Sequence, residues 1–304
     1  MGSDSRHGRD GHPRPPARAG EPGRELRVIG AVGAAAVDSL TRFLAELDRA
    51  RPERQRRPEN LVVVRRVGST NQLARAIVAD YEVEAQDLRP LLLLALEQTG
   101  GRGRQGRSWS SPAGKGVYAT RVLSLRDPAR LQNLPMLVGL GLCRALSRHL
   151  PLPCRLKWPN DLVVETAEGR RKLGGILIEA LIHPGEGAAA LIGFGVNHAH
   201  GEDDLPPAGT SLCLLGGAGA ELPLAELTWD LVDGVENELA HLDEPSAAVE
   251  AYRAMSVHRP GDFLSCRVGE QVLAGTFLGF DALGRLRLDR DGEEVLVASG
   301  EVIE

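Results

Sequence analysis

The sequence predicts a layered α/β or α+β fold with a mixed β-sheet, followed by a small all-β unit. Between residues 58 and 256, short β-branched or apolar runs alternate with longer stretches that repeat apolar residues at helical spacing. After about residue 260 the apolar segments become short and alternating, with glycine-containing turns between them. The chain has 304 residues, of which 42% are hydrophobic, so it can bury a sizeable core in one to three domains.

Residues 1–57 are expected to form a disordered tail and one amphipathic helix. Residues 1–24 are rich in Gly, Pro, Arg and Asp, with almost nothing apolar to bury. Residues 34–50 carry apolar side chains at helical spacing, and a charged linker with two prolines follows at 51–58. A helix-turn-helix module needs two or three helices, so we expect no DNA-binding domain and interpret the basic run 54–57 as a solvated linker.

Residues 58–256 are expected to form one domain around the mixed sheet. Its predicted strands are β-branched or apolar runs, at 61–67, 91–96, 117–125, 162–165, 176–181 and 188–193. Its predicted helices repeat apolar residues every three or four positions, at 71–80, 134–150 and 224–243. Residues 257–304 are expected to form a small barrel, with strands at 263–268, 271–280, 285–289 and 294–297.

Charge and cysteine usage exclude several classes of protein. The net charge of -5 and the pI near 6.0 give no global basic field for nucleic acid or an anionic membrane. No stretch approaches the ~18 uninterrupted apolar residues of a membrane span, and the first residues contain no apolar signal-peptide region. The four cysteines form no CxxC pair, which argues against a disulfide framework or a zinc site and favours a reducing cytoplasm. They are Cys143, Cys154, Cys213 and Cys266.

Lysine is rare among the basic residues. Only Lys115, Lys157 and Lys172 are lysines among 36 basic residues. Biased codon usage is one explanation, and a site that needs a compact, mobile ammonium group is the other. All three lie in segments punctuated by glycine or proline, which favours the second explanation.

Residues 100–109 read GGRGRQGRSW and follow a predicted buried strand. The glycines allow close backbone approach to a ligand, and the arginines offer bidentate hydrogen bonds to phosphate or carboxylate. We interpret the segment as an anion site rather than a flexible surface loop. It is no Walker A loop, because Gly-Lys-Ser/Thr is missing. It has no GxGxxG placed to open a helix, so a dinucleotide fold is disfavoured.

Two further segments carry lysine beside polar groups. Residues 157–161 read KWPND, where Lys157 can meet a phosphate and Asp161 can hold Mg²⁺ or receive a proton. The alternative is a Pro-Asn-Asp turn with a supporting salt bridge. Residues 171–179 read RKLGGILIE, and Lys172 stands at the start of a strand where two glycines leave room for a ligand. Together with residues 100–109, these segments predict a cationic cleft.

Two short segments have structural interpretations as well as functional ones. Residues 193–197 read GFGVN, and Asn197 either contacts a base or phosphate or satisfies a turn. Residues 68–71 read GSTN, whose side chains either receive a neutral polar head such as a ureido group or cap a helix.

The order of these segments resembles biotin–protein ligases. The shared motifs run GSTN, EQTGGRGRQGRSW, KWPNDL, RKLGGILIE and GFGVN, and a small β unit follows them. The resemblance extends from about residue 61 to the C-terminus, and its most specific parts are GRGRxGRxW and KWPND.

The resemblance implies an α+β fold of the class II synthetase and lipoate-ligase type, with a mixed-sheet catalytic domain flanked by helices at 58–256 and an SH3-like barrel at 257–304. It implies that biotin and MgATP give biotinyl-5'-AMP and pyrophosphate. A lysine of the biotin carboxyl carrier protein of acetyl-CoA carboxylase, or of a related carboxylase, then attacks the mixed anhydride. Biotin and ATP are substrates, Mg²⁺ is the metal, and no permanently bound cofactor is expected.

The resemblance also bears on partners and on the alternative activity. We expect a cytoplasmic enzyme without DNA or membrane partners, and a homodimer is left open. Some relatives carry an N-terminal winged helix-turn-helix and act as repressors, whereas this chain is expected to be a ligase without repressor function. A lipoate or octanoate–protein ligase of related fold is the alternative.

The resemblance implies the following site residues. The catalytic candidates are Lys172, Arg104 and Asp161, with Asp161 near the metal or the incoming amine. The biotin contacts are Ser69, Thr70, Asn71, Gln98, Arg102, Gly103, Arg104 and Lys172. The ATP contacts are Arg102, Arg107, Trp109, Lys157, Asn160 and Asn197.

The chemistry of these residues fits the implied reaction. A carboxylate that attacks the α-phosphate brings two anions together, so cations must offset their repulsion. Lys172 can bridge the two anions, while Arg102, Arg104 and Mg²⁺ take the remaining charge. We expect the glycine-arginine loop to close over biotin, with residues 201–210 as a candidate second loop over ATP. Trp109 either forms a wall of the biotin site or belongs to the core.

Overall fold

The computed structural model describes residues 26–28, 34–50, 60–83, 88–183, 187–244 and 246–303. The predicted tail at 1–24 and the predicted linker at 51–58 lie outside these residues. No helix among the described residues is long and apolar enough to cross a membrane.

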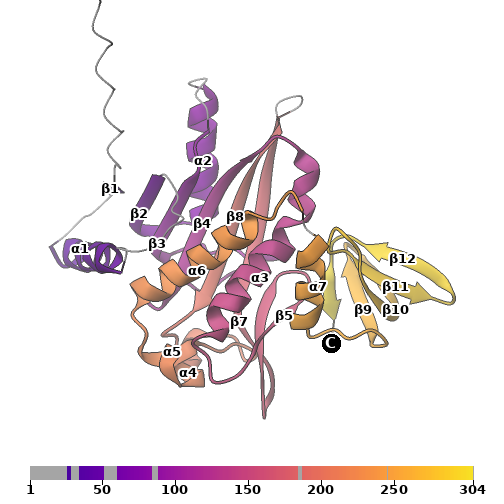
Figure 1. Cartoon of the computed structure of the whole chain (residues 1–304). Helices are drawn as coiled ribbons and strands as arrows, with labels where there is room; N and C mark the ends of the chain where they lie inside the picture. Colours follow the sequence, from indigo (N-terminus) through magenta and orange to yellow (C-terminus); the bar gives the residue numbers. More distant parts are fainter. Residues whose placement is uncertain are drawn as a thin grey trace, which may run out of the picture.

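An eight-stranded sheet forms the centre of the molecule (Figure 1). Its strands are β1 Leu26–Val28, β2 Asn60–Val67, β3 Leu91–Gln98, β4 Gly116–Leu125, β5 Cys154–Lys157, β6 Asp161–Thr166, β7 Gly169–His183 and β8 Gly187–Asn197. Their spatial order is β1-β2-β3-β4-β8-β7-β6-β5. Because β1, β2 and β3 are parallel and every later neighbouring pair is antiparallel, the predicted mixed sheet is confirmed.

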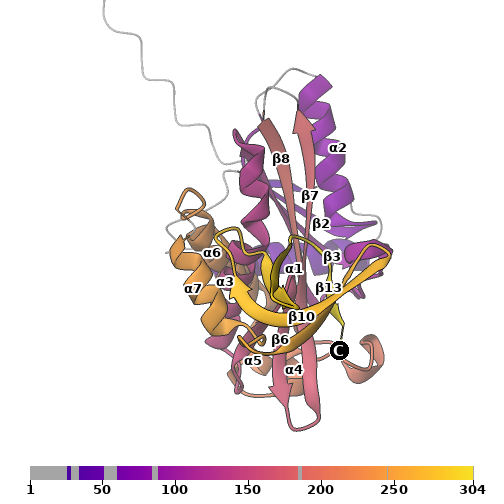
Figure 2. The ribbon, with the colours of Figure 1, turned by 90° about the vertical axis from the view of Figure 1, so that its right-hand side faces the viewer.

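Helices cover both faces of this sheet (Figures 1 and 2). They are α1 Ala34–Arg49, α2 Thr70–Val83, α3 Leu134–Ser147, α4 Leu212–Leu215, α5 Ala218–Glu221, α6 Leu224–Leu239 and α7 Ser246–Met255. Side chains alternate between the faces of a strand, so Val62 of β2 packs with the α2 layer while Val63 packs with the layer of α3 and α6. Gly141 of α3 and Gly234 of α6 let those helices meet backbone to backbone, because a Cβ on either would collide with the other.

The single predicted N-terminal helix is α1, which packs against the domain built around the central sheet. Its side chains Leu40, Phe43 and Leu47 are buried in the main core. The indole Nε1 of Trp229 in α6 donates a 3.0 Å hydrogen bond to the carbonyl of Leu47. This helix is therefore part of the same packed body as the sheet.

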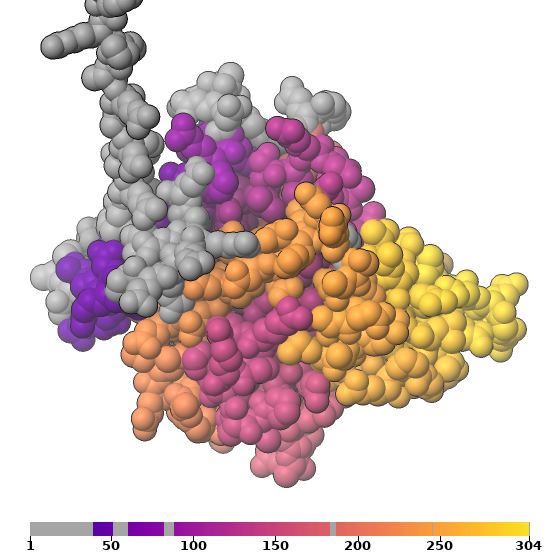
Figure 3. All heavy atoms as spheres, viewed as in Figure 1, coloured from indigo at the N-terminus to yellow at the C-terminus, as the bar shows by residue number. Residues whose placement is uncertain are grey.

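The C-terminal strands form an open antiparallel sheet, so the predicted closed barrel is wrong. They are β9 Phe263–Val268, β10 Gln271–Phe280, β11 Leu286–Arg290, β12 Glu293–Val297 and β13 Glu301–Ile303. Their order is β12-β11-β10-β9-β13, which leaves β12 and β13 as the two edges. The apolar face is covered by α7 instead of by closure, since the rings of Phe280 and Tyr252 lie 5.0 Å apart. Figure 3 shows the C-terminal strands beside the orange segment of α7.

Candidate active site

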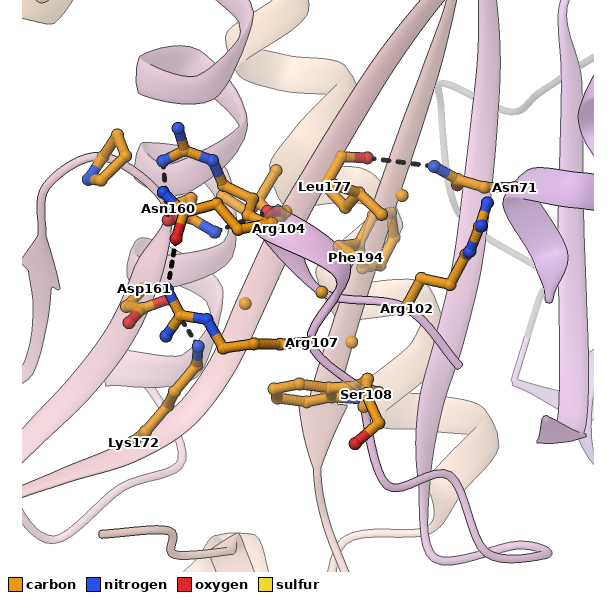
Figure 4. Close-up of a pocket in the computed structure, with 18 of the residues that line it drawn as sticks. Asn71, Arg102, Arg104, Arg107, Ser108, Asn160, Asp161, Lys172, Leu177 and Phe194 are labelled. Atoms are coloured by element: carbon orange, nitrogen blue, oxygen red, sulfur yellow. Dashed lines mark hydrogen bonds and ion pairs between the residues drawn. The ribbon is translucent and has the colours of Figure 1, made fainter. Parts of the chain in front are cut away.

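A cavity of about 550 Å³ lies between the central sheet and the C-terminal sheet. Segments far apart in the sequence line it, among them the start of α2, the glycine-arginine loop after β3, the turn between β5 and β6, the strands β7 and β8, Pro206, and Gly300 with Glu301. In the close-up, Arg104, Asn160, Asp161 and Lys172 gather on one side, while Asn71 lies across the cavity from them (Figure 4). Its volume suits a small organic ligand.

The glycine-arginine loop is fastened to the C-terminal sheet. It contains the short 3₁₀ turn η1 Arg104–Gly106, in which Gln105 has a φ of 55° and Gly106 a φ of 74°. Arg104 donates a 2.9 Å hydrogen bond to the carbonyl of Gly300. Arg107 forms a 2.5 Å ion pair with Glu301. Burial lowers the pKa of Arg104, and the negative charge of Asp161 partly offsets this by raising it. The guanidinium stays ionised in the physiological range.

The turn between β5 and β6 places an amide and a carboxylate in the cavity. The Asn160 Nδ2 group donates to the carbonyl of Ile176 at 2.9 Å, and its Oδ1 accepts from Arg104 at 3.4 Å. The indole of Trp158 is buried and donates to the carbonyl of Gly284 at 3.0 Å, which anchors the turn. Because both ends of the turn are held, Asn160 and Asp161 have fixed directions.

Lys172 lies at the centre of the charged side of the cavity. Its Nζ is 2.6 Å from Oδ1 of Asp161 and 5.5 Å from the centroid of the Trp109 ring. Its own backbone is held by residues 201–210: its N–H donates to the carbonyl of Ala208 at 2.7 Å, and its carbonyl accepts from Thr210 at 2.9 Å. Arg102, Arg107 and Lys157 also line the cavity, so the predicted cationic cleft is present in the structure.

The opposite side of the cavity is lined mostly by uncharged polar groups, with Arg102 beside Asn71 (Figure 4). Ser69, Thr70 and Asn71 lie at the start of α2 with at most 4% of each residue exposed. Gln98, at the end of β3, accepts a 2.8 Å hydrogen bond from the backbone N–H of Thr70. This side can therefore receive a neutral polar group, as the ureido interpretation of the GSTN segment requires.

The glycines of β8 make room for two side chains that line the cavity. A Cβ on Gly195 would lie 2.5 Å from Nε1 of Trp109, so the indole rests directly on this strand. A Cβ on Gly193 would collide with Oδ1 of Asn71. The two glycines of the GFG sequence therefore leave space for the side chains of Trp109 and Asn71, a role that the sequence alone did not indicate. Trp109 is half-buried and lines the cavity wall rather than the core.

Two predicted residues do not reach the cavity. Asn197 is buried at the end of β8 and donates a 2.9 Å hydrogen bond to the carbonyl of Thr210, so it ties the strand to the following loop. Its predicted contact with ATP stays a prediction. Lys115 is outside the cavity lining and pairs with Asp204 at 2.6 Å.

The sequence interpretation also missed residues that line the cavity. Glu301 is the first residue of β13, and Gly300 comes directly before it. Pro206 also lines the cavity, and it lies in the predicted second loop at 201–210. No local motif marks Gly300 or Glu301, because their place depends on how distant parts of the chain pack together.

Comparisons of the sequence with known proteins identify relatives of this chain. A model of the biotin/lipoate A/B protein ligase family matches residues 63–197. The biotin–[acetyl-CoA-carboxylase] ligase of Mycobacterium tuberculosis is 30% identical over 251 residues, which cover 80% of this chain and 88% of that protein. The Paracoccus denitrificans ligase of the same name is 32% identical over 219 residues, 69% of this chain and 88% of that protein. The match to the bifunctional ligase/repressor BirA of Escherichia coli is 29% identical and spans 61% of that relative.

Solved structures show the same fold. The biotin protein ligase from Aquifex aeolicus, in complex with biotin and ATP, superposes with a TM-score of 0.62 at 24% identity, covering 80% of this chain and 97% of that one. The enzyme from Leishmania major in complex with biotinyl-5-AMP gives a TM-score of 0.50 at 22% identity, covering 82% of this chain and all of that one. By fold and by sequence, the chain belongs to the biotin–protein ligases of the biotin/lipoate A/B protein ligase family.

Proposed function

We propose that this chain activates biotin with ATP to biotinyl-5'-AMP and then transfers biotin to a lysine of a biotin carboxyl carrier protein. The observation that carries the proposal is the division of one cavity into a side rich in charged groups and a side of mostly uncharged polar groups. The charged side holds Lys172, Arg104 and Arg107, and Asn71 lies across the cavity from them with Arg102 as its one charged neighbour in the close-up (Figure 4). Thr70 belongs to the same uncharged polar cluster as Asn71, since both contact the hydroxyl of Thr120. Biotin has the same division, with a carboxylate at one end and a neutral ureido group at the other.

The charged side offsets the repulsion between the two reacting anions. The carboxylate oxygen of biotin attacks the α-phosphorus of ATP, the bond to the bridging oxygen breaks, and pyrophosphate leaves. Fixed cations stabilise the charge that develops on the phosphoryl oxygens, and they cost little reorganisation because they are already in place. Lys172 contacts Asp161 and the Trp109 ring inside the cavity, which supports a role for its ammonium between the two anions. Positioning and charge suffice here without a covalent enzyme intermediate.

The acceptor lysine then attacks the carbonyl carbon of the mixed anhydride, and AMP leaves. Asp161 is the carboxylate on the charged side that can orient the incoming ammonium and accept its proton. The glycine-arginine loop covers the intermediate, because Arg104 and Arg107 fasten it to the C-terminal sheet. A closed loop keeps water from the anhydride.

The donor set of the cavity fits a magnesium ion that arrives with ATP. The described residues contain no group of three or more His, Cys, Asp or Glu side chains that could cage a metal alone. Mg²⁺ in nucleotide sites is held by one or two carboxylates together with phosphate oxygens and water. Asp161 would hold the ion, which supplies positive charge to the phosphates.

Biotin-dependent exchange of labelled pyrophosphate into ATP tests the first half-reaction. The second half-reaction is tested by the mass increase of a purified carrier domain and its loss when the acceptor lysine is replaced by arginine. Lipoate and octanoate serve as competing substrates in both assays. Exchange with biotin alone is the expected result. Exchange with lipoate but not with biotin, or no exchange, would contradict the proposal.

A further inference from the structure

Thr120 lies directly behind the neutral wall of the cavity. It is on β4, it is fully buried, and it is outside the cavity lining. Its hydroxyl oxygen lies 2.7 Å from Oδ1 of Asn71 and 2.8 Å from Oγ1 of Thr70. One buried hydroxyl therefore contacts two of the side chains that face the proposed ureido site.

The direction of each hydrogen bond follows from the partners. Asn71 places Nδ2 2.9 Å from a carboxylate oxygen of Glu179 and 3.3 Å from the carbonyl of Leu177. Both partners accept hydrogen bonds and cannot donate, so the NH₂ end of the amide must face them. The Oδ1 end then faces Thr120, whose single hydroxyl proton goes to it. The same hydroxyl of Thr120 also faces Oγ1 of Thr70 at 2.8 Å, and Thr70 donates its own hydroxyl proton to Oε1 of Gln98 at 3.2 Å.

The bonds of Gln98 fix the remaining polar groups of this wall. Its Oε1 accepts from the backbone N–H of Thr70 at 2.8 Å, and its Nε2 donates to the hydroxyl of Ser111 at 2.9 Å. These bonds leave one Nε2 proton of Gln98 unused. The oxygens of Asn71 and Thr70 each keep a lone pair, and Oδ1 of Asn71 lies over Gly193 in the cavity lining. The wall thus offers acceptors and a donor side by side, all uncharged.

We propose that Thr120 and Glu179 are positioning residues that make this wall specific for a urea-like group. A cyclic urea has N–H donors for the two acceptors and a carbonyl oxygen for the donor. A carboxylate lacks the donors, and a guanidinium lacks the acceptor. Without Thr120 the Oδ1 of Asn71 loses its buried donor, and without Glu179 its NH₂ group loses the closer of its two acceptors, so in either case the amide is held less firmly with its oxygen as an acceptor. A mismatched ligand then leaves buried polar groups unpaired, and sites of this kind discriminate strongly on that account.

The inference rests on the proposed function, so its test begins with a wild-type chain that shows biotin-dependent pyrophosphate exchange. Thr120→Val removes the hydroxyl and keeps the shape, and Thr120→Ser restores the hydroxyl. Thr228→Val is the matched control, because Thr228 is also buried and its hydroxyl donates a hydrogen bond to the carbonyl of Leu224 in α6, away from the cavity. Glu179→Ala removes the acceptor for Asn71 independently of Thr120, and Glu179→Gln keeps one acceptor oxygen.

We expect Thr120→Val and Glu179→Ala to raise the KM for biotin by about tenfold or more, with kcat and the KM for ATP changed by less than about threefold. Thr120→Ser, Glu179→Gln and Thr228→Val should stay within about threefold of wild type in the KM for biotin. A biotin KM that is unchanged in both disruptive variants would overturn the inference. So would an equal rise in the KM for ATP, or a serine variant as impaired as the valine variant. A wild-type chain without exchange contradicts the proposed function instead.

Discussion

Replacing Lys172 by methionine removes one positive charge and keeps the length of the side chain nearly unchanged. The ammonium lies 2.6 Å from Asp161, with 34% of the lysine side chain and 25% of the aspartate side chain exposed. A pair with this much exposure contributes at most about 1 kcal/mol to folding. The same charge in the water-excluded transition state is worth more, and removing one such donor typically slows catalysis by about 10²–10³. The variant should therefore fold normally and adenylate biotin slowly.

Lys115→Met is the matched control for this experiment. Lys115 also pairs with an aspartate at 2.6 Å, and 42% of its side chain is exposed, but it is outside the cavity lining. Single-turnover formation of biotinyl-5'-AMP should fall by about 10²–10³ in Lys172→Met and by less than about threefold in Lys115→Met. Both variants should unfold within a few degrees of wild type. A Lys172→Met enzyme with more than a tenth of wild-type adenylation, or equal losses in the two variants, would refute the assigned role of this charge.

Gly195→Ala should raise the KM for both substrates by about tenfold, because the added methyl group would lie 2.5 Å from Trp109 Nε1 and push the indole from the wall; unchanged kinetics would show that the indole is dispensable. Arg107→Glu should break the ion pair with Glu301, loosen the loop and release adenylate that labels bystander lysines. Adding Glu301→Arg should recover about 0.2–1 kcal/mol of the interaction between the two residues. Labelling that stays confined to the acceptor in Arg107→Glu would exclude the loop as a lid. Burial works to raise the pKa of Glu301, but the hydrogen bond from Arg107 holds that pKa below its usual value, so the pair persists at neutral pH and opens only under acid conditions. Burial lowers the pKa of His200 below 6.5, so below about pH 6.5 the unfolded chain binds a proton that the folded chain resists. The Tm should therefore fall as the pH drops below about 6.5, and His200→Gln should flatten that slope; an equally steep slope in the variant would contradict this.

The local chemistry of the site could be predicted from the sequence because each motif carries its own residues. Arg102, Arg104 and Lys172 were expected in one cleft, and the structure places all three in the lining of one cavity. Six strands of the central sheet, β2, β3, β4, β6, β7 and β8, were also predictable, since each contains a run of apolar residues, whereas the three-residue strand β1 was missed. The short strand β5 and the helix α7 were missed, because four residues give little periodicity and α7 has a polar exposed side.

Features that depend on long-range packing could not be predicted. Glu301 reaches the cavity only because β13 pairs with β9, more than thirty residues earlier in the chain. The expected barrel failed for a related reason: Tyr252 of α7 covers Phe280, so the sheet buries its apolar face without closing. Asn197 illustrates a different limit, because the sequence around a polar residue at a strand end does not say whether its side chain binds a backbone carbonyl, as the Nδ2 of Asn197 does, or a ligand.

The fate of the carboxylate oxygens of biotin tests most directly whether the cavity joins an acid to the innermost phosphorus of ATP. Biotin labelled with ¹⁸O in its carboxylate is incubated with the enzyme, ATP and the carrier domain, and the masses of AMP and pyrophosphate are measured by mass spectrometry. Attack on the α-phosphorus leaves one labelled oxygen in AMP when the lysine displaces it, and leaves pyrophosphate unlabelled. Unlabelled AMP, or label in pyrophosphate or orthophosphate, would contradict the account.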